Sequence, residues 1–567
     1  MADSLFVIDH LRVAYPSSNP QPIWAVDDVS LILSPGERLG LVGESSCGKS
    51  TLGRATMRLL PDTSQVQGEI RFEGRSVLQM NPAELRHFRG EAVALVFQDP
   101  MTRLDPLMTI GQHCIKTLKA HRPQLSTAQA KQKALETLAA VKIPANRWSQ
   151  YPHEFSGGMR QRVAIALALL LEPKLIVADE PTTSLDVTIA AQILQELTRL
   201  GQERDTAILI ISHDLAMVAA YCQRIAVMYR GKIVEIGPTQ EIFRNPQHPY
   251  TKSLLKSALH IHLDAGAELK TSGQSLELDS GMTPEASTKV PPLKMAPDQP
   301  LLQIQNLQQH YTLDQGWMQQ FLGKPPVIKA VDQVSLDLYA GEILGLVGES
   351  GCGKSTLSRT ILKLVHPTAG TVTFNGTDLT ALSSRAMQPY RRQIQMIFQD
   401  PNACLSAKMT VGQGIADPLL IHRLVTPQAA RTQVLEMLER VGLTPAKTYY
   451  DRYPKQLSGG QQQRVAIARA LITHPQLVIC DEPVSMLDAS IQAQVLELML
   501  ELKQEFDLTY LFITHDLWVA RYLCNRIAVM NGGQIVEVGE TAAIFTRPQH
   551  PYTQTLLNAA PLLTQVL

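Results

Sequence analysis

Short apolar runs alternate with amphipathic stretches along the chain. Leu175–Asp179 (LIVAD) and Ala207–Ser212 (AILIIS) are short runs rich in apolar and β-branched residues, as is typical of strands. Between them, Ile189, Ile193 and Leu197 recur at four-residue spacing, which predicts a helix with one apolar face. This order of strand, helix and strand favours the α/β fold class with a largely parallel sheet.

The same pattern occurs twice in the chain. The segment GLVGESSCGKSTL, Gly40–Leu52, returns as GLVGESGCGKSTL, Gly345–Leu357. The triplet SGG at Ser156 returns at Ser458, at nearly the same offset. Since this period is far longer than that of any stacked repeat, the sequence predicts two homologous domains and not a solenoid.

A different composition separates the two repeats. Residues 263–300 are rich in Pro, Ser, Thr and Ala and show neither helical nor strand periodicity, which is typical of a flexible linker. We therefore predict a first domain at residues 1–262, a linker at 263–300 and a second domain at 301–567, each domain ending in its own C-terminal extension.

The composition is that of a soluble globular protein, with 45% hydrophobic and 18% charged residues among 567. Lys plus Arg number 52 and Asp plus Glu number 52, so no net field attracts the chain to nucleic acid, and we expect no nucleic-acid partner. The longest apolar run, Val163–Leu171, is far shorter than the roughly 18 residues that span a bilayer. The N-terminus lacks the pattern of a signal peptide, so a cytoplasmic location is expected.

Both repeats contain a phosphate-binding pattern, GxxxxGK[ST], at Gly43–Ser50 and Gly348–Ser355. Each copy follows an apolar run and precedes a helical pattern, which is the context that this motif requires. Glycines let backbone N–H groups wrap the phosphates, while Lys49 or Lys354 reaches the β and γ phosphates. The expected nucleotide-binding residues are Gly43, Glu44, Ser45, Ser46, Cys47, Gly48, Lys49, Ser50 and Thr51, then Gly348, Glu349, Ser350, Gly351, Cys352, Gly353, Lys354, Ser355 and Thr356.

Acidic pairs follow one apolar run of each repeat. Asp179 and Asp481 stand where a carboxylate can reach a magnesium ion through water, next to the hydroxyls expected at Ser50 and Ser355. The next residues, Glu180 and Glu482, are the candidate general bases, because a carboxylate beside a γ-phosphate can polarise an attacking water. An acidic pair at a strand end is alone more often a solvated cap, but its distance from each phosphate loop is matched in both repeats.

With the triplets SGG at Ser156 and Ser458, the chain resembles a tandem ATPase of the ATP-binding cassette superfamily over both repeats. The resemblance implies two P-loop NTPase cores, each with a helical subdomain. It also implies that each signature caps the γ-phosphate held by the opposite domain, which gives two composite sites. The signature residues expected at ATP are Ser156, Gly157, Gly158, Ser458, Gly459, Gly460 and Gln461, with Met159 in place of the first glutamine.

The same resemblance assigns further roles residue by residue. Gln98 and Gln399 match the glutamine that touches magnesium and water near the transmembrane partner. His213 and His515 match the switch histidine that contacts the γ-phosphate. The tyrosines that match the adenine-stacking residue and the acids that match the loop between the sites are Tyr15, Tyr311, Asp186 and Asp488. Taken alone, either tyrosine could instead pack on its sheet, and either histidine could be a solvated residue.

Within the superfamily, the HPYT endings at Asn245–Leu255 and Arg547–Leu557 resemble those of the peptide, nickel and glutathione importer ATPases. As residues, Pro and Tyr after a helix indicate only a turn and a packed ring, so the motif indicates kinship and no chemistry. The resemblance implies an ATP-hydrolysing importer motor that uses ATP and Mg²⁺, with di- or oligopeptides as the default solutes and nickel complexes or glutathione as related ones. It would work with two transmembrane permease subunits and an extracytoplasmic solute-binding protein, at the cytoplasmic face of a bacterial inner membrane.

Three other tandem cassette proteins are alternatives. A factor acting on ribosomes would carry a long charged helical linker and basic surfaces, whereas this linker is Pro-rich and the net charge is zero. DNA-repair cassettes carry zinc-binding Cys pairs, and the seven Cys here form no CxxC pair. Sugar-importer tandem ATPases often have a degenerate second site, but here both Glu180 and Glu482 are present, so two hydrolysing sites are expected.

The first repeat departs from the second inside the phosphate loop. Ser46 stands where the second loop has Gly351, and a side chain there would strain the loop by about 1 kcal/mol if its φ is positive. The first site would then bind nucleotide less well. No Cys follows Cys524 or lies between Cys222 and Cys352, so we expect no iron–sulfur cluster in either extension.

Overall fold

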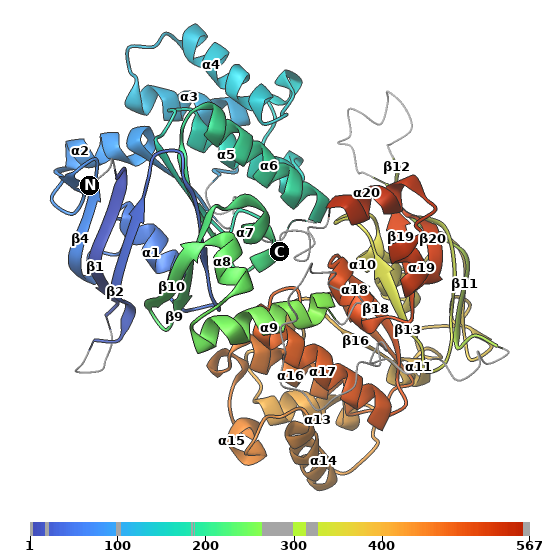
Figure 1. Cartoon of the computed structure of the whole chain (residues 1–567). Coiled ribbons are helices and arrows are strands. Elements are labelled where there is room, and N and C mark those ends of the chain that lie inside the picture. The colour runs from blue at the N-terminus through green and yellow to red at the C-terminus, as the bar shows by residue number, and fades with distance from the viewer. Residues whose placement is uncertain are drawn as a thin grey trace, which may run out of the picture. The chain divides into compact units, whose positions relative to one another are not determined.

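The computed structural model describes residues 4–16, 22–97, 104–182, 185, 187–263, 299–312 and 327–559. These residues divide into two compact units, with one ending at Leu259 and the other beginning at His260 (Figure 1). Most of the predicted linker, residues 264–298, lies outside the described residues, so its character stays a prediction.

Two sheets form the frame of the first unit. Its strands are β1 (Phe6–Ala14), β2 (Trp24–Leu33), β3 (Arg38–Val42), β4 (Gln65–Phe72), β5 (Arg75–Ser76), β6 (Val93–Val96), β7 (Leu175–Asp179), β8 (Ala207–Ser212), β9 (Arg224–Tyr229) and β10 (Lys232–Pro238). A six-stranded sheet has the order β10-β9-β3-β8-β7-β6, parallel except for β10, and a four-stranded antiparallel sheet has the order β2-β1-β4-β5.

The six-stranded sheet is buried on both faces, which explains why its strands read as continuous apolar runs. Along β8, Ile208 and Ile210 point into one core cluster while Leu209 and Ile211 point into the other. The second of these clusters also takes in side chains of the antiparallel sheet, and the first takes in side chains of the helices. The largely parallel sheet predicted from the sequence is confirmed.

The helices of the first unit are α1 (Lys49–Thr56), α2 (Pro82–His87), α3 (Ile110–His121), α4 (Thr127–Ala140), α5 (Gly157–Leu169), α6 (Val187–Glu203), α7 (Leu215–Tyr221), α8 (Thr239–Arg244) and α9 (Pro249–Leu263), with short helical segments at Phe88–Ala92, Ala145–Arg147 and Pro152–Glu154. Helices α3, α4 and α5 pack on one another and form the predicted helical subdomain (Figure 1). In α6, Ile193 and Leu197 are buried, as the four-residue spacing predicts.

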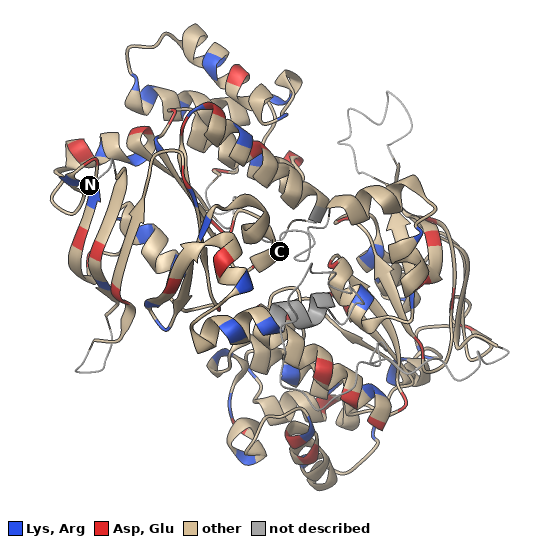
Figure 2. Ribbon diagram, viewed as in Figure 1, with Lys and Arg blue, Asp and Glu red and all other residues tan. Residues whose placement is uncertain are grey.

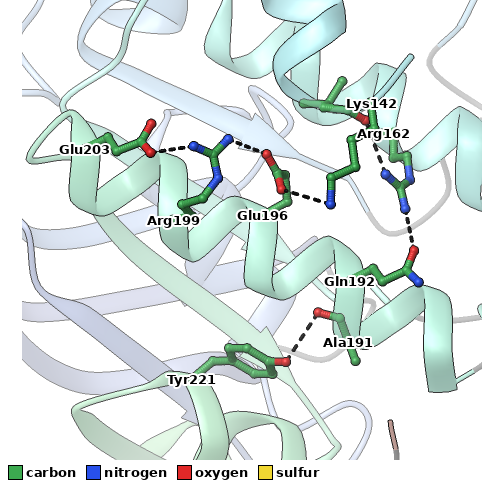
Figure 3. A network of polar contacts seen from close by, with 9 residues as sticks. Lys142, Arg162, Ala191, Gln192, Glu196, Arg199, Glu203 and Tyr221 are labelled. Atoms are coloured by element: carbon green, nitrogen blue, oxygen red, sulfur yellow. Dashed lines mark hydrogen bonds and ion pairs between the residues drawn. The ribbon is translucent and has the colours of Figure 1, made fainter. Parts of the chain in front are cut away.

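Polar contacts attach α6 to the helical subdomain and to α7 (Figure 3). Glu196 pairs with Arg199 on the same helix and with Lys142, which follows α4; its Oε2 lies 3.5 Å from the Lys142 Nζ. From α5, Arg162 donates to the Gln192 side-chain oxygen at 2.8 Å. The Tyr221 hydroxyl of α7 donates to the Ala191 carbonyl at 3.3 Å. These contacts fix the helix that follows β7.

The second unit repeats the architecture. Its strands are β11 (Leu302–Thr312), β12 (Val327–Leu338), β13 (Ile343–Val347), β14 (Ala369–Phe374), β15 (Thr377–Asp378), β16 (Ile394–Ile397), β17 (Leu477–Asp481), β18 (Thr509–Thr514), β19 (Arg526–Asn531) and β20 (Gln534–Glu540). They form a six-stranded sheet, β16-β17-β18-β13-β19-β20, and a four-stranded sheet, β12-β11-β14-β15. Taken from β20 to β16, the order of the six-stranded sheet matches that of the first unit position by position, and the four-stranded sheets match as written.

The helices of the second unit are α10 (Lys354–Ile361), α11 (Gln388–Gln393), α12 (Pro401–Cys404), α13 (Val411–Ile421), α14 (Pro427–Arg440), α15 (Ala446–Tyr450), α16 (Gly459–Leu471), α17 (Ala489–Glu505), α18 (Leu517–Leu523), α19 (Thr541–Thr546) and α20 (Pro551–Ala559), with a short 3-10 segment at Pro454–Gln456. Along the described part of the chain, none of the helices is long and apolar enough to cross a membrane. Figure 2 shows basic and acidic positions interspersed over the elements of both units.

Candidate functional site

The phosphate loops connect the central strands to the helices that follow. Residues 43–48 join β3 to α1, and residues 348–353 join β13 to α10. Gly48 and Gly353 precede these helices with φ of 109° and 111°. A Cβ on Gly48 would lie 2.1 Å from the Ala25 carbonyl oxygen, and one on Gly353 would lie 2.0 Å from that of Ala330. Only glycine fits at either position, because both the conformation and the space exclude a side chain.

The loop lysines are buried inside their own loops. The Lys49 Nζ donates to the carbonyl oxygens of Gly43 at 2.7 Å and Glu44 at 2.8 Å. The Lys354 Nζ makes the matching bonds to Gly348 at 2.7 Å and Glu349 at 2.9 Å. Each lysine is only 5% exposed, so its charge is concentrated on the concave side of the loop, where a phosphate group would bind.

The two loops differ in residue type at one position, Ser46 or Gly351, and the backbone there is left-handed in both. The φ angle is 66° at Ser46 and 82° at Gly351. The condition set in the sequence analysis, a positive φ at Ser46, is therefore met. A Cβ built on Gly351 would have no heavy atom within 4 Å, so a side chain at this position costs backbone strain and meets no steric obstacle.

A serine and an aspartate meet beside each loop. The Ser50 hydroxyl donates to the Asp179 carboxylate at 2.9 Å, and the Ser355 hydroxyl donates to that of Asp481 at 3.1 Å. Burial raises the pKa of both aspartates above the ordinary range; the serine hydrogen bond opposes this increase, and the charge of the next glutamate adds to it. Two oxygen ligands of the kind that Mg²⁺ takes therefore lie together, as predicted.

The candidate general bases have strained backbones. Glu180 has a φ of 48° and Glu482 a φ of 49°, in the left-handed region that glutamate rarely adopts. The backbone N–H of Glu180 donates to Ile211 and that of Glu482 to Ile513, both at 2.9 Å, so the neighbouring strand imposes the turn. Strain of this kind persists where the surrounding structure fixes it and is concentrated at active sites.

Each base lies next to the predicted switch histidine. The His213 Nδ1 is 3.3 Å from a Glu180 carboxylate oxygen, and the His515 Nδ1 is 3.1 Å from that of Glu482. Burial would raise the pKa of Glu482, but the hydrogen bond and charge of His515 outweigh it and lower that pKa. Burial likewise would lower the pKa of His515, and Glu482 raises it above the ordinary value. The pair therefore favours a carboxylate beside an imidazolium.

The glutamine of the second repeat also reaches the base. The Gln399 side-chain amide donates to a Glu482 carboxylate oxygen at 2.8 Å. This contact joins the predicted glutamine, base and histidine of one site. The matching Gln98 of the first repeat lies outside the described residues, as does Asp186, so both assignments remain predictions.

The SGG signatures open helices, and their two copies are capped differently. The Ser156 hydroxyl accepts the Met159 N–H at 3.4 Å. The Ser458 hydroxyl accepts from the Gln461 backbone N–H at 3.3 Å, and the Gln461 side-chain oxygen accepts in turn from the Ser458 backbone N–H at 3.1 Å. Met159 cannot make this return bond, so only the second copy forms the reciprocal capping box.

The second glycine of each signature packs against the helix that follows β7 or β17. A Cβ on Gly158 would lie 2.5 Å from the Ile189 Cγ2, and one on Gly460 would lie 2.6 Å from the Ile491 Cγ2. The close approach connects the signature helices α5 and α16 to α6 and α17. Asp488, which the resemblance places in the loop between the sites, precedes α17 as its N-cap residue.

The two predicted adenine-stacking tyrosines lie in different settings. The Tyr15 hydroxyl is 3.2 Å from the Thr51 hydroxyl, which places it at the first phosphate loop. Tyr311 lies on β11 with 41% of its surface exposed. Stacking on a base stays a prediction for both residues.

Sequence reasoning missed two residues that contact the phosphate loops. The backbone N–H of Glu44 donates to the Tyr250 hydroxyl at 3.1 Å, and that of Glu349 donates to the Tyr552 hydroxyl at 3.2 Å. Both tyrosines belong to the HPYT endings, which the sequence analysis took as a mark of kinship without chemistry. The available signal was the recurrence of the whole motif at a similar distance from both loops.

Comparisons with known proteins agree with this geometry. A family model described as "ABC transporter" matches residues 26–183 and 331–485, and one described as "Oligopeptide/dipeptide transporter, C-terminal region" matches residues 234–281 and 536–566. Proteins of Escherichia coli strain K12 and Shigella sonnei, both named "Glutathione import ATP-binding protein GsiA", are 41% identical to this chain over 573 residues. Each match covers 99% of this chain and 90% of the relative.

Solved structures of single cassettes also match. A dimeric structure of a post-hydrolysis state of the ATP-binding cassette MJ0796 bound to ADP and Pi is 30% identical, with a TM-score of 0.38. It covers 42% of this chain and 98% of that chain. A structure of cbiO1 from Clostridium perfringens is 25% identical, with a TM-score of 0.38, and covers 44% of this chain and 92% of that chain.

The family models match most of each repeat, and the relatives align along nearly the whole chain. The alternative of a factor acting on ribosomes finds no support in these comparisons. The chain belongs to the ABC transporter family, as a tandem ATP-binding subunit with two ATPase cassettes that drive an importer.

Proposed function

We propose that the chain energises import of glutathione or of small peptides like it. The observation that carries this proposal is the 41% identity, over 99% of this chain, to a protein named for glutathione import. The match of both C-terminal extensions to an oligopeptide and dipeptide transporter region supports the same class, because glutathione is itself a small peptide.

Two composite ATP sites are part of the proposal. ATP on Lys49 would be capped by Ser458, Gly459, Gly460 and Gln461, and ATP on Lys354 by Ser156, Gly157, Gly158 and Met159. Each signature serine and the N–H groups of the helix that it opens would face the γ-phosphate of the opposite cassette. Closing the two cassettes around ATP would then drive the permeases, and hydrolysis would reopen them.

Magnesium would be held by Ser50 with Asp179 and by Ser355 with Asp481, with Gln399, and by analogy Gln98, close by. Among the residues that the structure describes, no group of three or more His, Cys, Asp or Glu side chains is placed to hold a metal ion. The proposed sites therefore depend on serine hydroxyls and on the nucleotide itself. When bound, magnesium neutralises charge on the β and γ phosphates.

The chain's own side chains would carry the remaining chemistry. Glu180 and Glu482 would orient a water and accept its proton as the γ-phosphoryl group leaves ADP. His213 and His515, already paired with these carboxylates, would keep them ionised and turned toward the water. Lys49 and Lys354 would stabilise the negative charge of the phosphates.

The family resemblance implies the partners that transport needs. We propose two transmembrane permease subunits and an extracytoplasmic solute-binding protein, with this chain bound at the cytoplasmic face of a bacterial inner membrane. Gentle solubilisation of native membranes, capture of this chain and identification of what accompanies it tests the assembly. Two permease subunits are expected; recovery with ribosomes and no permease would overturn the transport function and leave the ATPase chemistry standing.

Uptake measurements test the substrate class. Cells that carry the chain are compared with cells that carry the Lys49→Ala, Lys354→Ala double variant, using labelled glutathione and a labelled dipeptide of neutral residues. We expect glutathione uptake to depend on both lysines. Unchanged glutathione uptake with lost dipeptide uptake would reassign the substrate to ordinary dipeptides, and no loss of either would refute the proposed class.

A further inference from the structure

The C-terminal extension of each cassette contacts the phosphate loop of the same cassette through one phenol. Glu44 and Glu349 occupy the second position of their loops. The N–H of each donates to a tyrosine hydroxyl, at 3.1 Å for Tyr250 and 3.2 Å for Tyr552. The contact bridges sequence separations of 206 and 203 residues, and it occurs in both cassettes.

The carbonyl of the same glutamate also holds the loop lysine. The carbonyl of Glu44 accepts from the Lys49 Nζ at 2.8 Å, and the carbonyl of Glu349 accepts from the Lys354 Nζ at 2.9 Å. One residue of the loop therefore bonds to the tyrosine through its N–H and to the lysine through its C=O. A change in its orientation would move the charge that binds the phosphates.

The tyrosine is placed by a built anchor. In the first cassette the Glu235 carboxylate accepts the N–H groups of Gln247 at 2.8 Å and His248 at 3.1 Å. The His248 Nδ1 then accepts the Tyr250 N–H at 3.2 Å, and Thr251 is 1% exposed. These bonds fix the first turn of α9 and with it the direction of the phenol.

The second cassette contains the same anchor. The Glu537 carboxylate accepts the N–H groups of Gln549 at 2.8 Å and His550 at 3.1 Å, and the His550 Nδ1 accepts the Tyr552 N–H at 3.2 Å. The QHPYT sequence thus has a structural meaning: it presents a tyrosine to the loop, by way of a carboxylate on β10 or β20.

We propose that Tyr250 and Tyr552 are positioning residues of the ATP sites. Each phenol holds the second residue of its loop in the orientation that aims the loop lysine and the following N–H groups at the phosphates. The C-terminal extension is thereby a determinant of ATP affinity in its own cassette. This inference rests on ATP binding at the loops and is independent of the transported solute.

The test uses the full chain with Glu180→Gln and Glu482→Gln, so that ATP binding is measured without turnover. Adding Lys354→Ala silences the second loop, and Kd for ATP with Mg²⁺ is then measured at the first loop with and without Tyr250→Phe. We expect Kd to rise about threefold to tenfold, because binding must then restore the loop orientation that this hydrogen bond maintains before ATP arrives. Adding Lys49→Ala in place of Lys354→Ala gives the reciprocal test of Tyr552→Phe.

The chain offers matched controls. The Tyr221 hydroxyl donates to the Ala191 carbonyl and the Tyr510 hydroxyl to the Met499 carbonyl, both away from the loops. Tyr221→Phe and Tyr510→Phe remove the same kind of bond and should leave Kd unchanged, whatever they do to the melting temperature. With the catalytic glutamates restored, the loop tyrosine variants should raise KM for ATP and leave kcat nearly unchanged.

The outcomes separate the proposals. Unchanged Kd in both Tyr250→Phe and Tyr552→Phe refutes the positioning role, even if both variants melt earlier. The same rise in Kd in the control variants also refutes it, because the effect would then be general. Shifted Kd values in the tyrosine variants, together with unchanged glutathione uptake in the Lys49→Ala, Lys354→Ala double variant, would support the tyrosine role and refute glutathione as the substrate.

Discussion

In the first cassette an ion pair of Glu196 joins α6 to the helical subdomain, and in the second a leucine takes that position of α17, whose ion pair to the subdomain lies at its other end, between Glu505 and Arg440 of α14. Glu196 of α6 pairs with Lys142 and Arg199. The repeat places Leu498 at the position of Glu196, and Leu498 is 7% exposed. Where Lys142 has a φ of 61°, Gly442 has a φ of 75°, so the backbone is kept while the ion pair is lost.

The candidate catalytic groups differ far less between the cassettes than these helix contacts do. The serine–aspartate and glutamate–histidine distances agree within a few tenths of an ångström between cassettes, and both glutamates have nearly the same left-handed φ. Backbone geometry set by the central sheet fixes these groups. The ion pair between this helix and the helical subdomain lies at different positions in the two cassettes, and the geometry at the strand ends is nevertheless the same.

The largest effect is expected where the cassettes agree most closely, at the two bases. Glu180→Gln and Glu482→Gln together should lower the ATPase rate at least about 100-fold, because a general base is removed from both sites. Each single variant should also lose rate, since a candidate base is present in both cassettes. The measurement is phosphate release by the full chain. A single variant with the parent rate would show that its site does not hydrolyse ATP, and retained turnover in the double variant would reject both bases.

A smaller effect, on the stability of each cassette, should distinguish Glu196 of α6 from the leucine at the same position of α17. Leu498→Ala should destabilise the second cassette by about 2–3 kcal/mol, the usual result of emptying a buried leucine site. Glu196→Ala should destabilise the first by about 0.5–1 kcal/mol, because its partners are largely solvated. Hydrogen exchange of peptides from α17 and α6 in the full chain measures each change locally. Equal protection losses would mean that the ion pairs contribute as much as the apolar contact.

Much of the catalytic frame could be predicted because its signals are local. The glycine spacing at residues 43–50 and 348–355, the apolar runs that become β7 and β8, and the acid after β7 all lie within short segments. Their recurrence in the second repeat tested each of them a second time. The four-residue spacing around Ile193 likewise needs only one turn of helix to be recognised.

What the sequence did not predict depends on contacts between distant segments. Glu180 has a left-handed backbone although it is not a glycine, so the sequence gives no sign of this conformation. A hydrogen bond to Ile211 on the next strand imposes it. The loop contact of Tyr250 joins residues 206 positions apart, and the local pattern around it reads only as a turn. Pairing of Gln399 with Glu482 was likewise beyond any local pattern, although the family resemblance placed both in one site.

Exchange of the one differing loop position should shift ATP affinity in opposite directions. Ser46 and Gly351 share a left-handed φ, which costs a residue with a side chain about 1 kcal/mol relative to glycine. Gly351→Ser should raise Kd for ATP at the second loop about fivefold, and Ser46→Gly should lower it at the first loop by a similar or smaller factor. Site-specific Kd values in Lys354→Ala and Lys49→Ala backgrounds provide the measurement. No change in either variant would mean that the loops tolerate the side chain without strain.

The smallest effect should be shared equally by the two cassettes, because their C-terminal anchors are alike. Burial would raise the pKa of Glu235 and Glu537, but hydrogen bonds from two backbone N–H groups outweigh it and hold both below the ordinary value. A carboxyl with a lowered folded-state pKa stabilises the fold above its unfolded pKa of about 4.3, and the contribution is lost as the pH falls through the folded-state value. Glu235→Gln and Glu537→Gln should therefore lower the urea midpoint of the full chain at pH 6, and the difference from the parent should shrink as the pH approaches 4 and below. A difference that stays constant from pH 6 down to about pH 3 would show that the carboxylate charge does not hold the anchor, and a response in only one cassette would show that the two anchors differ despite matching distances.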